Sequence, residues 1–396
     1  MAEQVVKPRM RGFISLTAHP DGCAANVREQ VARVRAAALE GALGTTLVLG
    51  SSTGYGLASA LTCVFGYGAP TLGVCFERPP EEDKTATAGW YNLAEAQRLA
   101  RAEGLTLRTI NGDAFSPEVK AETVARLRAE FGPLHMVIYS LAAPRRRGAD
   151  GTIWNSVLKP IGEPYTGVGF DLRNRDVVEA HIEPADEDEI AATVKVMGGE
   201  DWSDWMTTLR DAGLLAPGCR TVAYSYIGPE LTAAIYRRGT IGRAKEHLEA
   251  TAHELDRMMQ AACGGHAWVS INTGVVTQAS AAIPAVPLYM SILFRVMKER
   301  GFYETAVDQV VRLFRDHVGP GATPTIDDEQ RIRLDDREMR EEVQAKIEAL
   351  WGRVRGDNLD ETTDFAGYQR DFERLFGFGV PGVDYERPTE VSRALD

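Results

Sequence analysis

The sequence is poor in the features that mark disulfide-rich, zinc-binding and nucleic-acid-binding proteins. Its 396 residues include only five cysteines, which are scattered and never paired as Cys-x-x-Cys (Cys23, Cys63, Cys75, Cys219 and Cys263). The sequence therefore predicts neither a disulfide framework nor a zinc site. Acidic residues outnumber basic ones by 56 to 44, which gives a net charge of −12. This excess argues against nucleic acid as the main partner, because a phosphate backbone needs a basic face.

Long apolar runs are also absent. The most apolar stretch, residues 279–296, is interrupted by Pro284, Pro287 and Arg295. We interpret it as core or as the lining of a pocket, and not as a membrane span. The first residues lack the cationic and then apolar pattern of a signal segment. We therefore expect a reduced, cytoplasmic protein that is long enough to bury a large core.

Short apolar segments alternate with helical patterns along most of the chain. The strand-like segments are residues 45–49, 71–76, 105–110, 135–140, 220–226 and 266–272. This alternation predicts an α/β protein with a Rossmann-type, doubly wound parallel sheet. No linker divides the chain, so we expect one catalytic domain over residues 1–396, with extra N- and C-terminal elements. Residues 145–218 form an insertion with two helical patterns, which we expect on the substrate side.

A glycine-rich turn follows the first predicted strand. The strand ends at Gly50, and Gly54 and Gly56 precede a helix of small residues. Gly50 can make a tight turn, while the other two lack a Cβ, so that backbone can approach a pyrophosphate and the helix can pack close to its strand. The helix N-terminus then offers free N–H groups and the positive end of its dipole. An ordinary strand–turn–helix joint can show the same pattern, so the context decides.

The second predicted strand supplies that context, because it ends at Phe76 and Glu77. This acid lies about 20 residues beyond the glycines, where a dinucleotide-binding fold places a carboxylate on the adenosine ribose. A carboxylate accepts hydrogen bonds from the 2′- and 3′-hydroxyls and repels a 2′-phosphate, which favours NADH over NADPH. Arg78 weakens this preference, because a guanidinium can bind a 2′-phosphate.

Two further strand ends are expected at the same edge, since ligands of such sheets bind beyond the carboxyl ends of the strands. Asp113 follows the third strand and could accept a hydrogen bond from the adenine amino group. Alternatively, the Asp113 side chain could form an Asx turn or cap a helix. Residues 140–143 follow the fourth strand and are small enough to line the nicotinamide side.

The sequence lacks the Tyr-x-x-x-Lys pair that short-chain dehydrogenases place on one helical face. Tyr236 and Lys245 are nine residues apart, which on a continuous helix would turn them to opposite sides. Gly239, Thr240 and Gly242 allow a loop at Tyr236 and a helix that begins near Thr240, so the two side chains can converge. Such a tyrosine could act as a proton donor if a nearby cation lowered its pKa.

The spacing alone is not specific, because Tyr289 and Lys298 share it. Their intervening residues are apolar helix formers, so those two side chains should diverge. Tyr236 differs because it follows a predicted strand at the expected mouth of the site. A packed aromatic and a solvated helix lysine stay open as alternatives for Tyr236 and Lys245.

Several stretches together resemble the FabV-class trans-2-enoyl-ACP/CoA reductases, relatives of the short-chain dehydrogenase/reductase superfamily. They run from the beginning to the end of the chain: 7–8 and 11–14, 19–20 and 22–23, 50–57, 87–92, 111–115, 159–163, 196–202, 223–228, 276–280 and 375–385. The resemblance implies NADH-dependent reduction of the 2,3 double bond of trans-2-enoyl thioesters, the final reductive step of fatty-acid elongation.

The resemblance also implies roles for individual residues. Tyr236 and Lys245 match the family's Tyr-x8-Lys pair, and Tyr226 matches a substrate contact. NAD contacts are implied at Gly50, Ser51, Ser52, Thr53, Gly54, Tyr55, Phe76, Glu77, Asp113, Ala114, Leu141, Ala142, Lys245, Val275, Val276 and Thr277. In this mechanism hydride adds to the β-carbon and Tyr236 donates a proton to the enolate oxygen. Lys245 holds the ribose hydroxyls and lowers the pKa of Tyr236.

The expected partners are an enoyl-CoA or enoyl-ACP thioester, with acyl carrier protein as a candidate docking protein, and the chain is expected to be a monomer. Arginines 145–147 and 237–238 could meet CoA phosphates or an acidic carrier-protein face, or could simply be solvated. The stretch at 279–296 could line the acyl channel or be plain core. A carbonyl reductase and an NADH sensor without turnover are the alternative functions.

Overall fold

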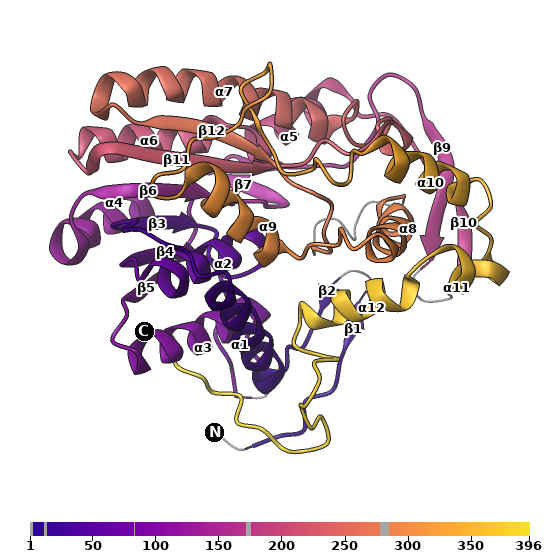
Figure 1. Ribbon diagram of the computed structural model, residues 1–396, viewed down its shortest axis with the longest axis horizontal. Helices are drawn as coiled ribbons and strands as arrows, with labels where there is room; N and C mark the ends of the chain where they lie inside the picture. Colours follow the sequence, from indigo (N-terminus) through magenta and orange to yellow (C-terminus); the bar gives the residue numbers. More distant parts are fainter. Residues whose placement is uncertain (1–2, 12–13, 83, 172–175, 278–284) are drawn as a thin grey trace.

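The computed structural model describes residues 3–11, 14–82, 84–171, 176–277 and 285–396. Its centre is a seven-stranded parallel sheet with the order β13-β12-β11-β6-β3-β4-β5 (Figure 1). The predicted Rossmann-type class is therefore confirmed. The strands are β3 (Thr46–Leu49), β4 (Thr71–Cys75), β5 (Leu107–Asn111), β6 (Leu134–Tyr139), β11 (Leu215–Ser225), β12 (His266–Ile271) and β13 (Ile332–Arg333).

The strand order reverses at β3, and this reversal creates a switch point in the sheet. Every residue of β3 and β4 is buried, as expected for strands covered by helices on both faces. The chain builds β3, β4 and β5 in one direction and then crosses back, so that β6 pairs with the free side of β3 from Thr46↔Met136 to Leu49↔Tyr139. In such sheets the crevice at this reversal is the ligand site.

Two helical layers cover the sheet. One contains α1 (Pro20–Ala36), α2 (Gly54–Leu61), α3 (Ala88–Ala102) and α9 (Ala306–Leu313), whose apolar faces share a core around Val34, Leu61 and Val310. The other contains α4 (Pro117–Arg126), α6 (Glu200–Asp211) and α7 (Thr240–Cys263), packed around Trp202 and Trp205. Both layers hold the ends of β3 and β6 in fixed positions.

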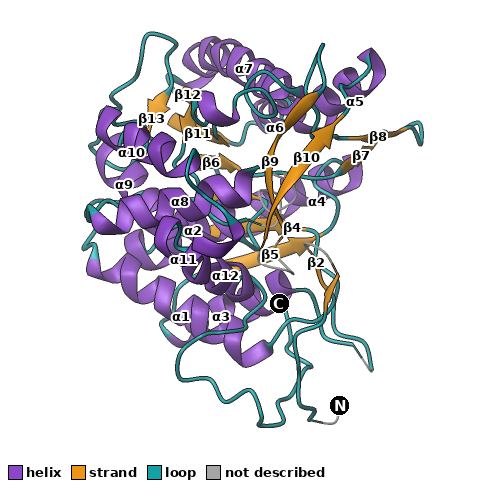
Figure 2. Ribbon diagram, turned by 90° about the vertical axis from the view of Figure 1, so that its right-hand side faces the viewer, coloured by secondary structure: helices purple, strands orange, loops and turns teal. Residues whose placement is uncertain are grey.

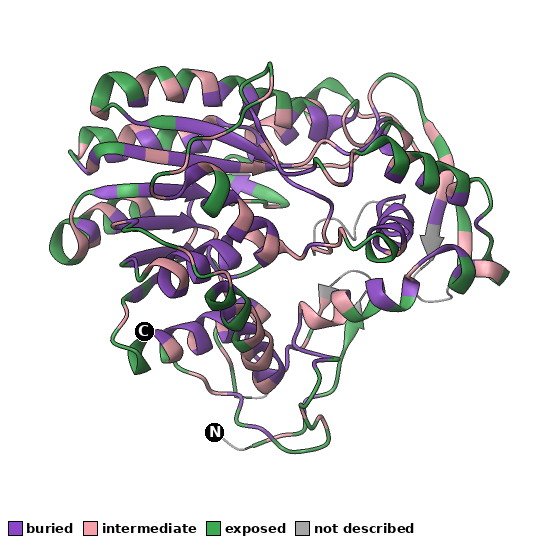
Figure 3. Ribbon diagram, in the orientation of Figure 1, coloured by how far each residue is buried: buried purple, intermediate pink, exposed green. Residues whose placement is uncertain are grey.

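A third apolar cluster lies to one side of the sheet (Figure 1). Its centre is α8 (Val286–Glu299), which is buried along most of its length (Figure 3). Around it pack α10 (Glu341–Trp351), α11 (Leu359–Thr362), α12 (Phe365–Arg374) and the hairpin of β9 (Tyr165–Asp171) and β10 (Asp176–Ile182). The described part of the apolar stretch at 279–296 is thus helical core, while residues 279–284 lie outside the described residues.

The insertion at 145–218 contains more strand than we predicted. The two helices are present as α5 (Glu187–Met197) and α6, but the antiparallel pairs β7 (Arg145–Arg147) with β8 (Ile153–Asn155) and β9 with β10 were missed. Figure 2 shows β9 and β10 as a long ribbon. These hairpins are only partly buried, so their sequences lack the continuous apolar runs of the central strands. That the chain forms a single domain stays a prediction.

The remaining short strands, β1 (Met10–Arg11) and β2 (Ile14–Ser15), pair near the N-terminus. The C-terminal tail returns to α3, where the Tyr91 hydroxyl donates to the Val391 carbonyl at 2.8 Å. In the described part of the chain, every helix is too short or too polar to cross a membrane.

Candidate active site

The glycine-rich turn lies against the end of β6, at the switch point of the sheet. Gly50 has a φ of +84°, and a Cβ on it would lie 2.1 Å from the Ser140 carbonyl oxygen. Only glycine fits there without displacing backbone. Leu141 also touches this position, so the predicted 50–55 and 140–143 loops meet as expected.

The start of α2 presents an open face to a ligand. A Cβ on Gly56 would lie 1.9 Å from the Gly50 carbonyl oxygen, so this glycine lets the helix pack on its own strand turn. Gly54 has a φ of +53°, and a Cβ on it would meet no described atom within 4 Å. Thr53 at the N-cap makes no side-chain hydrogen bond to the first turn. The N–H groups of this turn are therefore available to an anion.

Glu77 is fixed beside the same turn. Its Oε1 accepts a hydrogen bond from the Ser52 hydroxyl at 2.5 Å. The Asn111 side chain holds the Glu77 backbone, accepting from its N–H at 2.7 Å and donating to its carbonyl at 2.8 Å. Burial raises the pKa of Glu77, and the bonds from Ser52 and Thr87 oppose this rise. The carboxylate is thus oriented by groups at the ends of two neighbouring strands.

The residues predicted to contact adenine lie at the same sheet edge. The Phe76 side chain is 77% exposed, which leaves its ring free to contact a ligand. Asp113 accepts from the Phe115 N–H at 3.0 Å in an Asx turn, the alternative that the sequence left open. Ala114 is buried, and its carbonyl accepts from Trp205 at 3.1 Å. A contact from Asp113 to adenine remains a prediction.

Tyr236 lies on a loop, and α7 begins four residues later at Thr240, as predicted. The Tyr236 carbonyl accepts from the N–H groups of Gly239 and Gly242 at 3.1 and 3.0 Å, which folds the loop back on the helix start. A Cβ on Gly242 would lie 1.8 Å from the Arg237 carbonyl oxygen, so only glycine permits this approach. The other pair with this spacing, Tyr289 and Lys298, has no such loop between its two members.

Both members of that second pair lie within α8 and point to different partners, as expected. The Tyr289 hydroxyl donates to Glu338, while the Lys298 ammonium binds Asp364 at 2.6 Å. The glycines between Tyr236 and Lys245 therefore distinguish the candidate pair from a chance repetition of its spacing.

Lys245 occupies the second turn of α7, and its Nζ lies 3.4 Å from the Tyr224 carbonyl oxygen. Burial lowers the pKa of Lys245 to about 8. We expected Lys245 to lower the pKa of Tyr236, and this is wrong for the protein as described. Burial raises the pKa of Tyr236, and the Glu338 carboxyl adds to the rise. Tyr236 thus keeps its proton throughout the neutral range.

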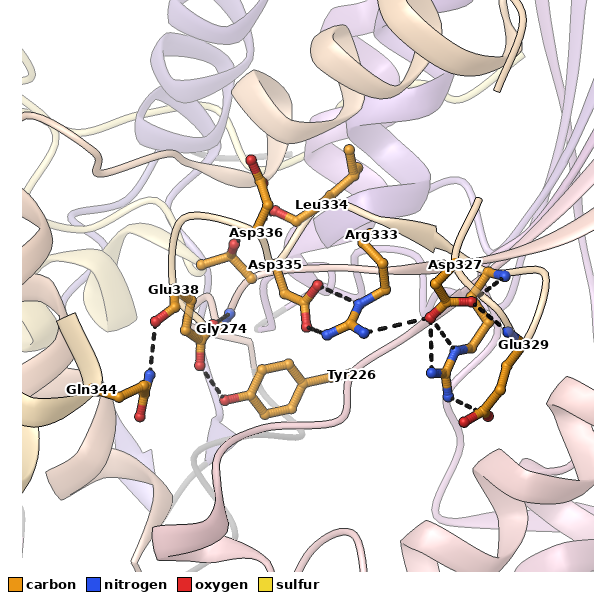
Figure 4. Close-up of polar contacts among 12 residues, drawn as sticks. Tyr226, Gly274, Asp327, Glu329, Arg333, Leu334, Asp335, Asp336, Glu338 and Gln344 are labelled. Carbon is orange, nitrogen blue, oxygen red and sulfur yellow. Dashed lines mark hydrogen bonds and ion pairs between the residues drawn. The ribbon is translucent and has the colours of Figure 1, made fainter. Parts of the chain in front are cut away.

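Tyr226 follows β11, and its ring meets that of Tyr236 edge to face, with the centroids 5.1 Å apart. Its hydroxyl donates to Oε1 of Glu338 at 2.8 Å (Figure 4). Glu338 was missed by the sequence analysis, because it lies 112 residues from Tyr226 in a charged segment with no distinguishing motif. Only the fold brings it to the site.

The loop after β12 is held from three sides. The Tyr55 hydroxyl lies 2.8 Å from the Thr273 carbonyl oxygen, and the Thr273 N–H donates to Gln309 at 2.9 Å. The Gly274 N–H donates to Oε2 of Glu338 at 2.7 Å. These contacts place Thr273 beside Tyr55 of the glycine-rich turn and Gly274 beside Tyr226, whose hydroxyl lies 3.5 Å from the position of a Cβ on Gly274. Residue 278 and those up to 284, including the rest of the 276–280 motif, lie outside the described residues.

Three of the five clustered arginines are ion-paired, whereas Arg145 and Arg147 are exposed. Arg146 is buried in β7, where its guanidinium lies 3.3 Å from Glu200 and 3.5 Å from Asp204. Arg237 pairs with Glu249 at 2.9 Å, and Arg238 pairs with Glu230 at 2.7 Å. Neither our expectation that these clusters bind an anionic partner nor the solvated alternative describes Arg146, which is a structural ion-pair residue.

Three family models match consecutive parts of this chain. They are the NAD(P)H binding domain of trans-2-enoyl-CoA reductase at residues 5–82, the trans-2-enoyl-CoA reductase catalytic region at 84–318, and the enoyl reductase FAD binding domain at 326–389. The described residues of the third segment do not fit FAD. They form helices packed on α8 in place of a strand–glycine turn–helix unit, and Gly377 is closed off by the backbone of His19 and Cys23.

Relatives match over nearly the whole chain. Enoyl-acyl-carrier-protein reductases (NADH) from Opitutus terrae and Flavobacterium johnsoniae are 52% and 50% identical, over 96% and 97% of this chain and 97% of each relative. The crystal structure of Treponema denticola trans-2-enoyl-CoA reductase with NAD has a TM-score of 0.94 at 46% identity and covers 99% of both chains. That of the Clostridium acetobutulicum enzyme with NADH has a TM-score of 0.95 at 35% identity, over 99% of this chain and 100% of that one. Geometry, sequence and fold agree, and the chain belongs to the trans-2-enoyl-CoA reductase family.

Proposed function

We propose that this protein reduces the 2,3 double bond of trans-2-enoyl thioesters with NADH, as the final reductive step of fatty-acid elongation. The observation that carries the proposal is the convergence of two sites at one sheet edge. The open turn at Gly54 with the fixed carboxylate of Glu77 suits a dinucleotide without a 2′-phosphate. The Tyr236 loop and Lys245 lie at the end of β11, on the far side of the switch point.

The residues present fit the cofactor. The first turn of α2 would hold the pyrophosphate, Glu77 the adenosine ribose, and Lys245 the second ribose. Residues 141–142 and 275–277 would flank the nicotinamide. When bound, NADH supplies the hydride that adds to the β-carbon of the enoyl thioester.

The protein's own contribution is the donor that meets the developing negative charge. As charge builds on the thioester oxygen, the Tyr236 hydroxyl donates a hydrogen bond and then a proton toward the enolate. The raised pKa of Tyr236 keeps this proton available at neutral pH. One such donor contributes about 10²–10³ in rate. The ring of Tyr226 forms the wall beside it and steadies the thioester.

The substrate carrier and the setting belong to the proposal as well. We infer that both CoA and acyl-carrier-protein thioesters are accepted and that the monomer acts in the cytoplasm. The buried, ion-paired Arg146 does not supply the carrier contact, so any contact from this cluster would come from the exposed Arg145 and Arg147. Elution volume on a sizing column, with and without carrier protein, tests the monomer and the docking together.

The primary test follows NADH oxidation with crotonyl-CoA, a longer 2-enoyl-CoA and an enoyl-acyl carrier protein, with NADPH in parallel. We expect turnover with NADH and little with NADPH. A 3-ketoacyl thioester serves as the control substrate, because a carbonyl reductase would prefer it. NADH binding without oxidation of any enoyl thioester would refute the proposal and favour a sensor.

Tyr236→Phe tests the assigned proton donor. We expect kcat to fall by about 10²–10³, because the transition state loses one hydrogen-bond donor, while NADH affinity is kept. Tyr303→Phe is the matched control, since it removes a tyrosine hydroxyl that donates to Asp371 in the α8 cluster. Unchanged kcat in Tyr236→Phe would remove Tyr236 from the role.

A further inference from the structure

Glu338 is a fully buried carboxyl group that joins three elements around the candidate site. Its Oε1 accepts from the hydroxyls of Tyr226, after β11, and Tyr289, on α8, at 2.8 and 2.7 Å. Its Oε2 accepts from the Gly274 N–H, after β12, at 2.7 Å. One side chain thus fixes the wall of the substrate site and the loop beside the nicotinamide position.

The described surroundings of Glu338 contain no ion-pair partner for it. The titratable groups that face it are the hydroxyls of Tyr55, Tyr226, Tyr236 and Tyr289, together with Asp335 on its own segment. Asp335 is itself paired with Arg333 at 2.7 Å. Burial raises the pKa of Glu338 to about 7, against the opposing effect of its three hydrogen bonds. A buried carboxyl without a cation destabilises a fold, so a purely structural role is a poor explanation for it.

The hydrogen-bond pattern decides where a proton on this carboxyl would point. Oε2 faces the Gly274 N–H, a fixed donor, so the proton belongs on Oε1. The Tyr289 oxygen already accepts from the Gln344 amide at 3.3 Å. Among the described residues, no amide donates to the Tyr226 oxygen, and the neighbouring Tyr289 hydroxyl already donates to Glu338. The Tyr226 oxygen is therefore the acceptor for the Glu338 proton. Tyr226 would then turn its own hydroxyl hydrogen away from Glu338.

We propose that Glu338 is a positioning residue that sets the direction of the hydrogen bond at Tyr226. With Glu338 ionised, Tyr226 donates to the carboxylate and presents only lone pairs to the thioester. With Glu338 protonated, the carboxyl donates to Tyr226, whose hydroxyl is released to donate to the thioester oxygen beside Tyr236. This inference rests on the proposed function, and it assigns Tyr226 a second donor role that depends on the protonation of Glu338.

The test is the pH dependence of kcat/KM for crotonyl-CoA at saturating NADH, which keeps the titration of Lys245 at the cofactor out of the profile. For the wild-type protein we expect kcat/KM to fall as the pH rises through about 7. The fall should be roughly tenfold or more between about pH 6 and pH 8.5, since a full donor contributes about 10²–10³.

Glu338→Gln should remove this fall. The glutamine oxygen can accept from Gly274, and an amide hydrogen can donate to Tyr226, so at Tyr226 the variant imitates the protonated acid at every pH. At about pH 8.5 it should therefore turn over crotonyl-CoA faster than the wild-type protein. A structural role alone would lower activity at all pH values and would not flatten the profile.

Two further variants complete the experiment. Tyr226→Phe should also have a flat profile, and adding Glu338→Gln to it should change nothing more. Glu304→Gln is the matched control, a buried carboxyl paired with Arg312 and Arg337, and it should keep the wild-type profile. NADH titration of each variant checks that it is folded.

A profile that is flat in the wild-type protein, or a fall that persists in Glu338→Gln or Tyr226→Phe, overturns the inference. If Glu338→Gln does not fold, the profile of Tyr226→Phe alone decides. Absence of any enoyl turnover by the wild-type protein would instead refute the proposed function, so the two failures are distinguishable.

Discussion

Substitution of Gly56 and Gly54 by alanine should separate the two tasks of the glycine-rich turn. A Cβ on Gly56 would lie 1.9 Å from the Gly50 carbonyl oxygen, whereas a carbon and an oxygen in contact need about 3.3 Å. The turn must therefore shift by about 1.4 Å. Overpacking of this kind costs about 1–3 kcal/mol of folding free energy, and the neighbour here is backbone, which cannot rotate away.

Gly54→Ala should act differently, because the space at its Cβ is open. Its φ of +53° lies in the left-handed region, where a side chain costs about 1–2 kcal/mol. If the pyrophosphate approaches this open face, the new methyl group also blocks the cofactor. We therefore expect a modest loss of stability and at least a tenfold rise in the Kd for NADH.

Gly104→Ala is the matched control for this strain. Gly104 has a φ of +70°, nothing within 4 Å of a Cβ, and a position after α3 away from the turn. Urea unfolding measures stability, and NADH fluorescence titration measures Kd. Gly56→Ala should lower both the stability and the affinity for NADH, whereas Gly104→Ala should lower only the stability. If Gly54→Ala binds NADH as tightly as Gly104→Ala does, the open face is not the pyrophosphate site.

Three further predictions concern charged groups. Glu77→Gln should raise the efficiency with NADPH relative to NADH, because the carboxylate that repels a 2′-phosphate is gone; an unchanged preference in parallel assays would contradict this. Burial lowers the pKa of Lys245 to about 8, so Lys245 loses its charge as the pH rises through that value and NADH should bind more weakly above it. Lys245→Arg should remove this pH dependence of the Kd for NADH. If NADH affinity still falls with rising pH in this variant, Lys245 is not the group responsible. Arg146→Glu should destabilise the protein by about 1–3 kcal/mol, since it puts a carboxylate at a buried position that faces the partly exposed Glu200 and Asp204; unaltered urea unfolding would show that Arg146 contributes nothing there.

The sequence by itself determined the elements whose causes are local. The apolar runs of β3, β4 and β12 are buried on both faces of the sheet, which is why these strands were found near their observed bounds. The glycines at 50, 54 and 56 and those at 239 and 242 act on neighbouring backbone, so the turn and the helix start after Tyr236 could also be predicted. The resemblance to known reductases then named the residues on them.

Tertiary structure decided the rest, because it depends on contacts between distant parts of the chain. A surface arginine cluster and a buried ion-paired Arg146 look alike in sequence, and only packing against α6 distinguishes them. The hairpins of the insertion are only partly buried, so they leave no continuous apolar run in the sequence. The pKa of Tyr236 is raised and not lowered, because burial and Glu338 act on it in the folded protein. Glu338 itself carries no local signal, since its chemistry arises only where β11, β12 and α8 bring three hydrogen-bond donors to one carboxyl group.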